Sequence, residues 1–259
     1  MTDYQTLAVD RSGAVLRITL NRPDAANGID AAMARELAEA ARACDDPAVK
    51  VAVITGAGRF FSAGGDLKEF ASAPDRGRHL KGVADDLHRA ISTLARTDAV
   101  VIAAVNGAAA GAGFSLALCG DLVLAARSAS FTMAYTRVGL SPDGSASYTL
   151  PRLVGTIRAK ELMLTNRTLA APDALQWGLV TDVVADDELA ARADELAATM
   201  ATTCSGSTAG VKALLLASLG NGLEEQMELE GRLIAERADS ADGREGVDAF
   251  LAKRAPDFA

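Results

Sequence analysis

The chain has 259 residues, 49% of them hydrophobic, and a formal net charge of −8. This length can bury one large core, and no run of about 18 apolar residues is present that could span a membrane. The charge imbalance lies in residues 186–259, which carry 15 acidic and 7 basic side chains and are interpreted as solvated helix faces. Because phosphate binding needs clustered Lys and Arg, this acidic balance argues against nucleic acid as a partner.

Cysteine and histidine are too few and too scattered to suggest a metal site. The three cysteines form no C-x-x-C pair, and the N-terminal sequence lacks the basic and apolar regions of a secretory signal, so a reducing, cytoplasmic location is expected. The two histidines, His79 and His88, form no H-x-x-x-H pair, so no metal ligand set is predicted.

The first half of the chain alternates strands with helices. Residues 14–21 alternate apolar and polar side chains as a strand does, and Pro23 and Gly28 then break the pattern. Asp30 is a good N-cap for a helix with an apolar stripe. The other predicted elements are a helix over 30–46, buried strands over 48–58, 99–107 and 121–126, and a helix over 79–96. Such apolar strands separated by helices are typical of a mainly parallel sheet covered on both faces.

Helices dominate the second half of the chain. Short helical segments are predicted between residues 145 and 181, where Pro172 suits the first turn of a helix. From residue 186 onward almost the whole chain has a helical pattern. The apolar faces of these helices must be covered by the sheet or by another subunit.

Two buried strands run into glycine-rich loops, within residues 53–70 (VITGAGRFFSAGGDLKEF) and 100–121 (VVIAAVNGAAAGAGFSLALCGD). Ligands of parallel sheets bind beyond the carboxyl ends of the strands. Neither a G-x-G-x-x-G nor a G-x-x-x-x-G-K-[ST] motif is present, so a nucleotide site is not supported. The turns at 64–66 and 111–113 could each offer a backbone N–H to one oxygen and form an oxyanion hole. The alternative is that these small residues only permit close packing of helix on sheet.

Three polar side chains near these loops have ordinary structural explanations. Asp66 opens D-L-K-E, which is a capping box with Glu69. Asp121 stands at a turn between a helix and a strand. His88 lies on a charged helix flank and is expected to be solvated.

Four segments in series resemble the enoyl-CoA hydratase/isomerase (crotonase) family. They are LNRPDAANGID (20–30), VITGAGRFFSAGGDLKEF (53–70), AVNGAAAGAGFSLALCGDLVLAA (104–126) and ELMLTNRTLAAPDALQWGLVTDVV (161–184). The resemblance covers essentially the whole chain. It implies an α/β fold in which a spiral of ββα units, residues 1–198, is followed by a helical C-terminal segment, residues 199–259. In the family that segment packs trimers, often as dimers of trimers.

The resemblance also implies the substrate class. Family substrates are acyl-CoA thioesters, and the shared chemistry is an enolate held by two backbone N–H groups, which by position are those of Gly65 and Ala112. CoA is part of the substrate, so no separate cofactor and no metal are implied. The residues expected to line the adenine and pantetheine channel or to meet the CoA phosphates are Ala63, Gly64, Gly65, Asp66, Leu67, Lys68, Arg22 and Arg59.

The predicted reaction depends on three positions. Ser115 and Tyr135 stand where hydratases of the family carry two glutamates, so efficient addition of water is not expected. Asp143 stands where several isomerases of the family carry an aspartate, and one carboxylate suffices to move a proton from one carbon to another. We therefore expect an enoyl-CoA isomerase in which Asp143 transfers the proton, with Ser115 and Tyr135 beside the substrate. Asp143 could instead only cap the following helix.

Other reactions remain open. The chain could act as an enoyl-CoA hydratase or as a non-catalytic acyl-CoA-binding protein. It also resembles 4-chlorobenzoyl-CoA dehalogenases, which use an aspartate at this place together with a Trp at position 135 and a His near Ser92. Both of those side chains are missing from the sequence pattern. The determinants of acyl specificity are expected within 70–95 and 131–148, where Met133, Tyr135 and Tyr148 could shape the pocket.

Overall fold

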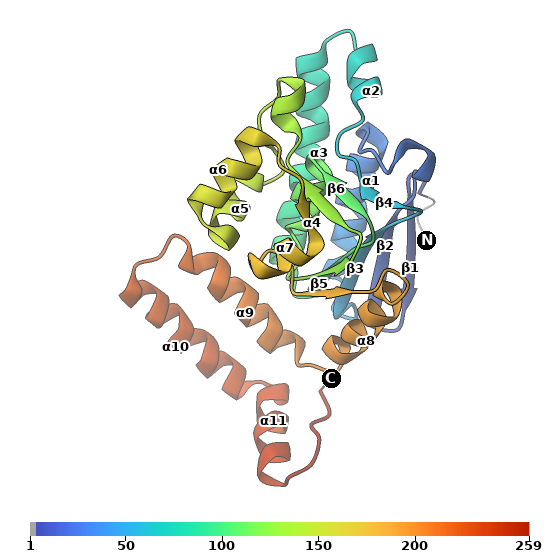
Figure 1. Ribbon diagram of the computed structural model, residues 1–259. Coiled ribbons are helices and arrows are strands. Elements are labelled where there is room, and N and C mark those ends of the chain that lie inside the picture. The colour runs from blue at the N-terminus through green and yellow to red at the C-terminus, as the bar shows by residue number, and fades with distance from the viewer. Residues whose placement is uncertain (1–3, 259) are drawn as a thin grey trace.

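A computed structural model describes residues 4–258, and its largest layer is a six-stranded sheet (Figure 1). The strand order is β1-β2-β3-β5-β7-β10; β1 and β2 are antiparallel and the other neighbours are parallel. The strands are β1 (Leu7–Ser12), β2 (Val15–Leu20), β3 (Val51–Gly56), β5 (Val100–Val105), β7 (Leu122–Ala126) and β10 (Asp182–Val184). All residues of β5 are buried, as expected for a parallel strand covered on both faces.

A second, smaller sheet repeats the path of the first. Its strands, in the order β4-β6-β8-β9, are β4 (Phe60–Ser62), β6 (Ala108–Ala110), β8 (Ser130–Thr132) and β9 (Leu169–Ala170). Each of β4, β6 and β8 follows a long strand of the first sheet after a short turn. Gly107 makes one of these turns, and a Cβ there would lie 2.1 Å from the main-chain oxygen of Arg59. This repeated pattern confirms the expected α/β class.

Helices cover the sheets (Figure 1). Helix α1 (Ala31–Arg42) packs against α3 (Arg76–Arg96), and the Asp30 side chain caps α1 by accepting from the Met33 amide, as predicted. Helix α8 (Leu189–Ala201) crosses the predicted boundary at residue 198 and packs on β3, β5 and β7. The remaining helices of this part are α2 (Leu67–Ser72), α4 (Ala112–Ala117), α5 (Ala146–Val154), α6 (Thr156–Thr165) and α7 (Ala171–Gln176), with short 3-10 turns η1 (Pro23–Ala25), η2 (Ala43–Asp45) and η3 (Tyr135–Val138).

The last three helices project from this body: α9 (Ser205–Ser218), α10 (Leu223–Asp239) and α11 (Ala241–Leu251) (Figure 1). Helix α9 is tied to the body by Lys212, whose Nζ lies 2.8 Å from Asp121 Oδ2 and donates to the main-chain oxygens of Leu94 and Ala99. Asp121 is thus an anchor for α9 and not only a turn residue, which corrects the sequence interpretation.

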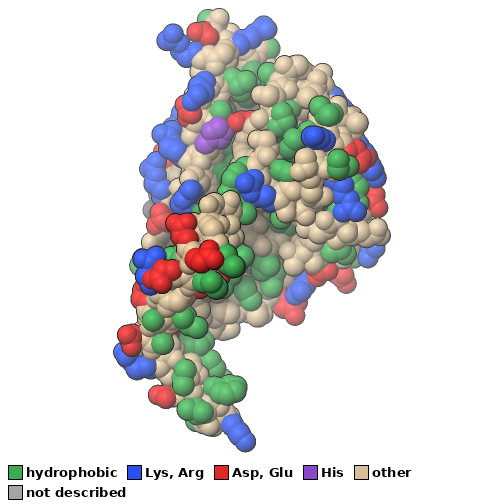
Figure 2. Space-filling view, turned by 90° about the vertical axis from the view of Figure 1, so that its left-hand side faces the viewer, with side chains coloured by type: hydrophobic (Ala, Val, Ile, Leu, Met, Phe, Trp, Pro, Cys, Tyr) green, Lys and Arg blue, Asp and Glu red, His purple; other side chains and the backbone are tan. Residues whose placement is uncertain are grey.

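Large apolar side chains stay exposed on the projecting helices, and Figure 2 shows them as separate patches over this part of the molecule. Those on α9, α10 and α11 are Val211, Leu215, Leu223, Met227, Ile234, Val247, Phe250 and Leu251. Within residues 4–258, no helix combines the length and the apolar character needed to cross a bilayer.

Two features of the fold were not predicted. Strand β1 was missed because most of its side chains are exposed and it lacks a buried alternating face. The short strands β4, β6, β8, β9 and β10 were missed because two or three residues carry no detectable periodicity.

Candidate active site

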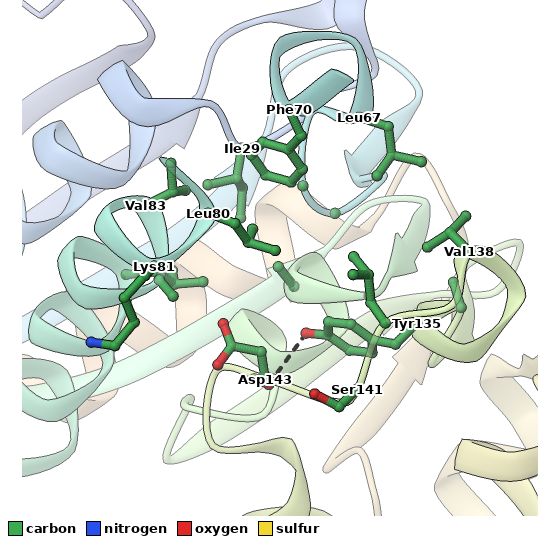
Figure 3. A pocket seen from close by; sticks show the side chains of 18 of the residues that line it. Ile29, Leu67, Phe70, Leu80, Lys81, Val83, Tyr135, Val138, Ser141 and Asp143 are labelled. Carbon is green, nitrogen blue, oxygen red and sulfur yellow. Dashed lines mark hydrogen bonds between the residues drawn. The ribbon is translucent and has the colours of Figure 1, made fainter. Parts of the chain in front are cut away.

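A cavity of about 380 Å³ lies where the loops after β4, β6 and β8 meet α3. Figure 3 shows its apolar side chains: Phe70 and Leu80 lie on one side, Tyr135 and Val138 on the other, and Asp143 lies below Leu80 beside the Tyr135 hydroxyl. Asp143 is the one acidic residue among the described residues that line the cavity. Among the described residues that line the cavity, Lys81 is the only cation, and it is paired with Asp85. The cavity therefore suits an apolar group that meets one carboxylate.

Two glycine-containing loops form one wall of the cavity, and their backbones touch. Gly64 has a φ of +93°, and a Cβ there would lie 2.7 Å from the main-chain oxygen of Ala110. A Cβ on Gly113 would lie 2.5 Å from the main-chain oxygen of Ser62. Both positions therefore require glycine, because side chains would push the loop after β4 away from the start of α4.

Within residues 4–258, the amide N–H groups of Gly65 and Ala112 donate no hydrogen bond. The residues on either side of Gly65 do form main-chain hydrogen bonds: the Ile29 amide donates to the Gly64 oxygen, and the Asp66 amide donates to the Ile29 oxygen. Ala112 is the first residue of α4, so no helical acceptor precedes it. Both residues line the same cavity, so two unsatisfied donors border the space that the Asp143 carboxylate also borders.

The Asp143 main chain is held firmly. Its carbonyl oxygen accepts from the Ser115 hydroxyl at 2.8 Å and from the Tyr135 hydroxyl at 3.2 Å; the second bond is the dashed line in Figure 3. The N-cap residue of α5 is Ser145, and the Asp143 carboxylate accepts no amide of that helix. The capping interpretation of this side chain is therefore wrong.

Ser115 and Tyr135 form a buried polar pair under Asp143. Their hydroxyl oxygens lie 2.9 Å apart, and the Ser115 side chain does not line the cavity, whereas Tyr135 does. Burial raises the pKa of Tyr135 to about 12, with the nearby Asp143 charge acting in the same direction, so the phenol stays protonated.

His88 contacts Asp143, which corrects the expectation that it is merely solvated. Its Nε2 lies 2.7 Å from Asp143 Oδ1, although the two residues are 55 positions apart. The His88 side chain remains 46% exposed. His88 lies on the exposed flank of α3, beside the buried stripe that includes Leu87 and Ile91, so the helical pattern carried no signal for this contact.

The polar residues proposed for CoA binding do not line the cavity. Asp66 caps α2 by accepting from the amides of Lys68 and Glu69, as predicted. The reciprocal half of the capping box is absent, because the Glu69 carboxylate accepts from Ala31 instead. Burial raises the pKa of Asp66, but the amide of Glu69 and the Arg22 guanidinium outweigh it and lower the pKa overall.

Arg22 is already engaged, since it pairs with Asp30 at 3.1 Å and with Asp66 at 3.0 Å. Lys68 and Arg59 are exposed, and Lys68 directly follows the lining residue Leu67. The predicted residues that do line the cavity are Ala63, Gly64, Gly65, Leu67, Ala112, Tyr135 and Asp143. Of the three side chains proposed to shape the pocket, Met133 is fully buried and Tyr148 faces another cavity.

Comparison with known proteins gives a consistent family. The enoyl-CoA hydratase/isomerase family model matches residues 10–259. Similar proteins include the 1,2-epoxyphenylacetyl-CoA isomerase of Escherichia coli (strain K12), 41% identical over 94% of each chain. A probable enoyl-CoA hydratase of Rhodobacter capsulatus is 40% identical over 98% of each chain, and the carnitinyl-CoA dehydratase of Salmonella typhi is 37% identical over 97% of each.

Solved structures agree with these relatives. A putative enoyl-CoA hydratase from Streptomyces coelicolor A3(2) superposes with a TM-score of 0.94 at 32% identity, covering 100% of this chain and 96% of the other. An enoyl-CoA hydratase from Bacillus anthracis gives 0.93 at 31% identity, covering 98% and 99%. The similar proteins differ in the reactions that their names give.

Proposed function

The chain belongs to the enoyl-CoA hydratase/isomerase family, and we propose that it is an enoyl-CoA isomerase in which Asp143 carries the proton. The observation that supports this is the position of a single carboxylate in a largely apolar cavity bordered by two unsatisfied backbone N–H groups. Shifting a double bond needs one base that becomes an acid, and this site has one. Adding water to a double bond needs two such groups.

In the proposed reaction the thioester oxygen accepts from the N–H groups of Gly65 and Ala112. Asp143 removes a proton from C2 of a 3-enoyl-CoA, and the negative charge spreads onto the thioester oxygen as a dienolate. The two N–H donors stabilise this charge, a contribution of about 3 kcal/mol for each well-placed donor. Asp143 then returns a proton to C4, which leaves a 2-enoyl-CoA. No cofactor beyond the CoA of the substrate takes part.

The test is the conversion of a 3-enoyl-CoA in heavy water by wild-type protein and by Asp143→Asn. Isomerisation is expected to fall by about 10²- to 10⁴-fold in the variant, the range for losing a general acid–base group. Binding of the acyl-CoA should persist. Isomerisation or exchange that continues in Asp143→Asn would remove this residue from its role. Binding without any exchange in the wild type would favour a non-catalytic acyl-CoA-binding protein, and rapid hydration of crotonyl-CoA would favour a hydratase.

A second candidate, an aryl-CoA dehalogenase, is favoured by the contact between His88 and Asp143. In that reaction the carboxylate attacks the ring carbon that bears the halogen, halide leaves, and water activated by the histidine hydrolyses the aryl ester. The missing Trp at position 135 argues against it, because the Tyr135 hydroxyl bonds to the Asp143 main chain and not to its carboxylate. Release of chloride from 4-chlorobenzoyl-CoA would support this candidate over the isomerase.

The projecting helices are proposed to form the contacts of a trimer or a dimer of trimers. This assembly would cover the exposed apolar side chains of α9, α10 and α11, including Ile234 and Phe250, which are 71% and 82% exposed.

A further inference from the structure

His88 stands between two cavities. Asp143 lines the active-site cavity, whereas His88 lines a second cavity of about 990 Å³ between α3, α5 and α9. The hydrogen bond of 2.7 Å between His88 Nε2 and Asp143 Oδ1 is therefore a polar link through the wall that separates them. An acyl group that fills the first cavity covers the cavity side of Asp143 and leaves His88 open to the second.

The other charged groups around His88 have partners of their own. Within the second cavity, Lys212 is paired with Asp121, and Arg96 donates to the hydroxyl and main chain of Ser92. Arg152 stacks on the Tyr148 ring and donates to its main-chain oxygen. On the same helix as His88, Asp85 is paired with Lys81. Asp143 is thus the carboxylate to which the His88 ring is bound.

An imidazole in this position can serve the carboxylate in both protonation states. A ring N–H donates to the ionised carboxylate, and an unprotonated ring nitrogen accepts from the carboxylic acid. Both side chains are partly exposed, His88 46% and Asp143 37%. A substrate in the first cavity would cover Asp143 from that side, whereas the His88 ring also borders the second cavity and can exchange its protons with water there.

We propose that His88 is a proton relay through which Asp143 exchanges its proton with solvent while the substrate is bound; this rests on the proposed isomerase function. After Asp143 takes the C2 proton, its acid proton passes to His88 Nε2 and gives an imidazolium beside a carboxylate. The imidazolium exchanges its protons with water, and a solvent-derived proton then returns to Asp143 and goes to C4. The net charge is unchanged, and the proton in the product comes from solvent. Without the relay, the proton taken from C2 is the one delivered to C4.

The test measures where the product proton comes from. An unlabelled 3-enoyl-CoA is converted in heavy water, and the ratio of deuterated to undeuterated 2-enoyl-CoA at C4 is read by NMR and mass spectrometry. In His88→Gln the amide can still donate to Asp143 but cannot carry a proton. We expect this ratio to fall by at least about tenfold relative to the wild type, because a proton-transfer group has been lost. Ser92→Ala, one turn further along α3 in the same second cavity, should leave the ratio unchanged.

The outcomes separate the relay from other roles. If His88→Gln slows isomerisation but keeps the wild-type ratio, His88 only holds Asp143 in place and the relay is overturned. Complete retention of the C2 proton by the wild type also overturns the relay and leaves the isomerase intact. A wild-type protein that neither shifts the double bond nor exchanges removes the proposed function and the relay with it. Circular dichroism and thermal unfolding confirm that each variant is folded.

Discussion

The hydroxyl oxygens of Ser115 and Tyr135 lie 2.9 Å apart, and both hydroxyls also reach the main-chain oxygen of Asp143. The family resemblance implies that these are the two positions at which a hydratase is expected to carry glutamates. In this chain they are neutral groups that hold the backbone of the proposed acid–base residue. The two positions expected to differ from a hydratase thus support a carboxylate further along the chain.

Replacement of Tyr135 by Phe is expected to destabilise the protein by about 1 kcal/mol, because it removes a buried hydrogen-bonding hydroxyl. The raised pKa of about 12 gives this loss a pH dependence. The pKa of Tyr135 is about 10 in the unfolded chain and higher in the folded protein. The contribution of its hydroxyl to stability is therefore complete below about pH 10, and is lost as the pH rises through the folded pKa of about 12. The difference in unfolding free energy between wild type and Tyr135→Phe should therefore shrink in strong alkali. The difference between the phenolate spectra of the wild type and Tyr135→Phe reports on Tyr135. If this difference titrates at about pH 10, the buried environment of Tyr135 is contradicted.

Replacement of Gly64 by Ala is expected to displace the loop that carries the Gly65 amide. The substitution combines a φ of +93° with a Cβ 2.7 Å from the Ala110 oxygen, and should cost about 2 to 4 kcal/mol in stability. A shift of the donor should lower isomerisation by about 10²-fold. The matched control is Gly178→Ala, which has a φ of +74° and open space around the Cβ. Gly178→Ala should lower stability only by the backbone strain and should leave activity unchanged. If the two variants lose equal activity and stability, the close approach of the loops is unimportant.

Replacement of Lys212 by Met is expected to loosen α9 and to do so more at higher pH. Burial raises the pKa of Asp121, and the Lys212 ammonium opposes this rise. Removing the ammonium raises the pKa of Asp121 in the folded protein further above its pKa in the unfolded chain. The folded variant therefore binds a proton at Asp121 more tightly than the unfolded chain does. Its stability is lost as the pH rises through the folded pKa. We expect a loss of about 2 kcal/mol near pH 8 and a smaller loss near pH 5. Chemical unfolding at both pH values measures this, and adding Asp121→Asn should remove the difference between them.

Replacement of Ile234 by Asp is expected to weaken the proposed assembly, because it places a charge in an apolar face that partners would bury. Sedimentation velocity should show a shift toward monomers, whereas Ile234→Leu keeps the apolar surface and should sediment as the wild type does. If the wild type is itself monomeric, or if both variants sediment alike, α10 is not part of a subunit interface.

Local sequence patterns determined most of the secondary structure. The helix stripes behind Asp30 and over 79–96 and the apolar strands at 48–58 and 99–107 were found because their periods repeat within one element. The small residues of the two loops also marked the wall of the cavity, since glycine is required where backbones touch. The resemblance carried by these loops added Asp143, which does line the cavity.

Contacts between distant segments were decided only by the tertiary structure. The sequence by itself could not pair His88 with Asp143 across 55 residues, join Arg22 to Asp66 across 44, or bring Lys212 to Asp121. Periodicity tells which face of an element is buried, but not which polar group on another element meets it, because that depends on how the layers pack. The fold class and the glycine loops therefore followed from local chemistry, whereas the partner of the proposed acid–base residue followed from the packing of α3 against the loop before α5.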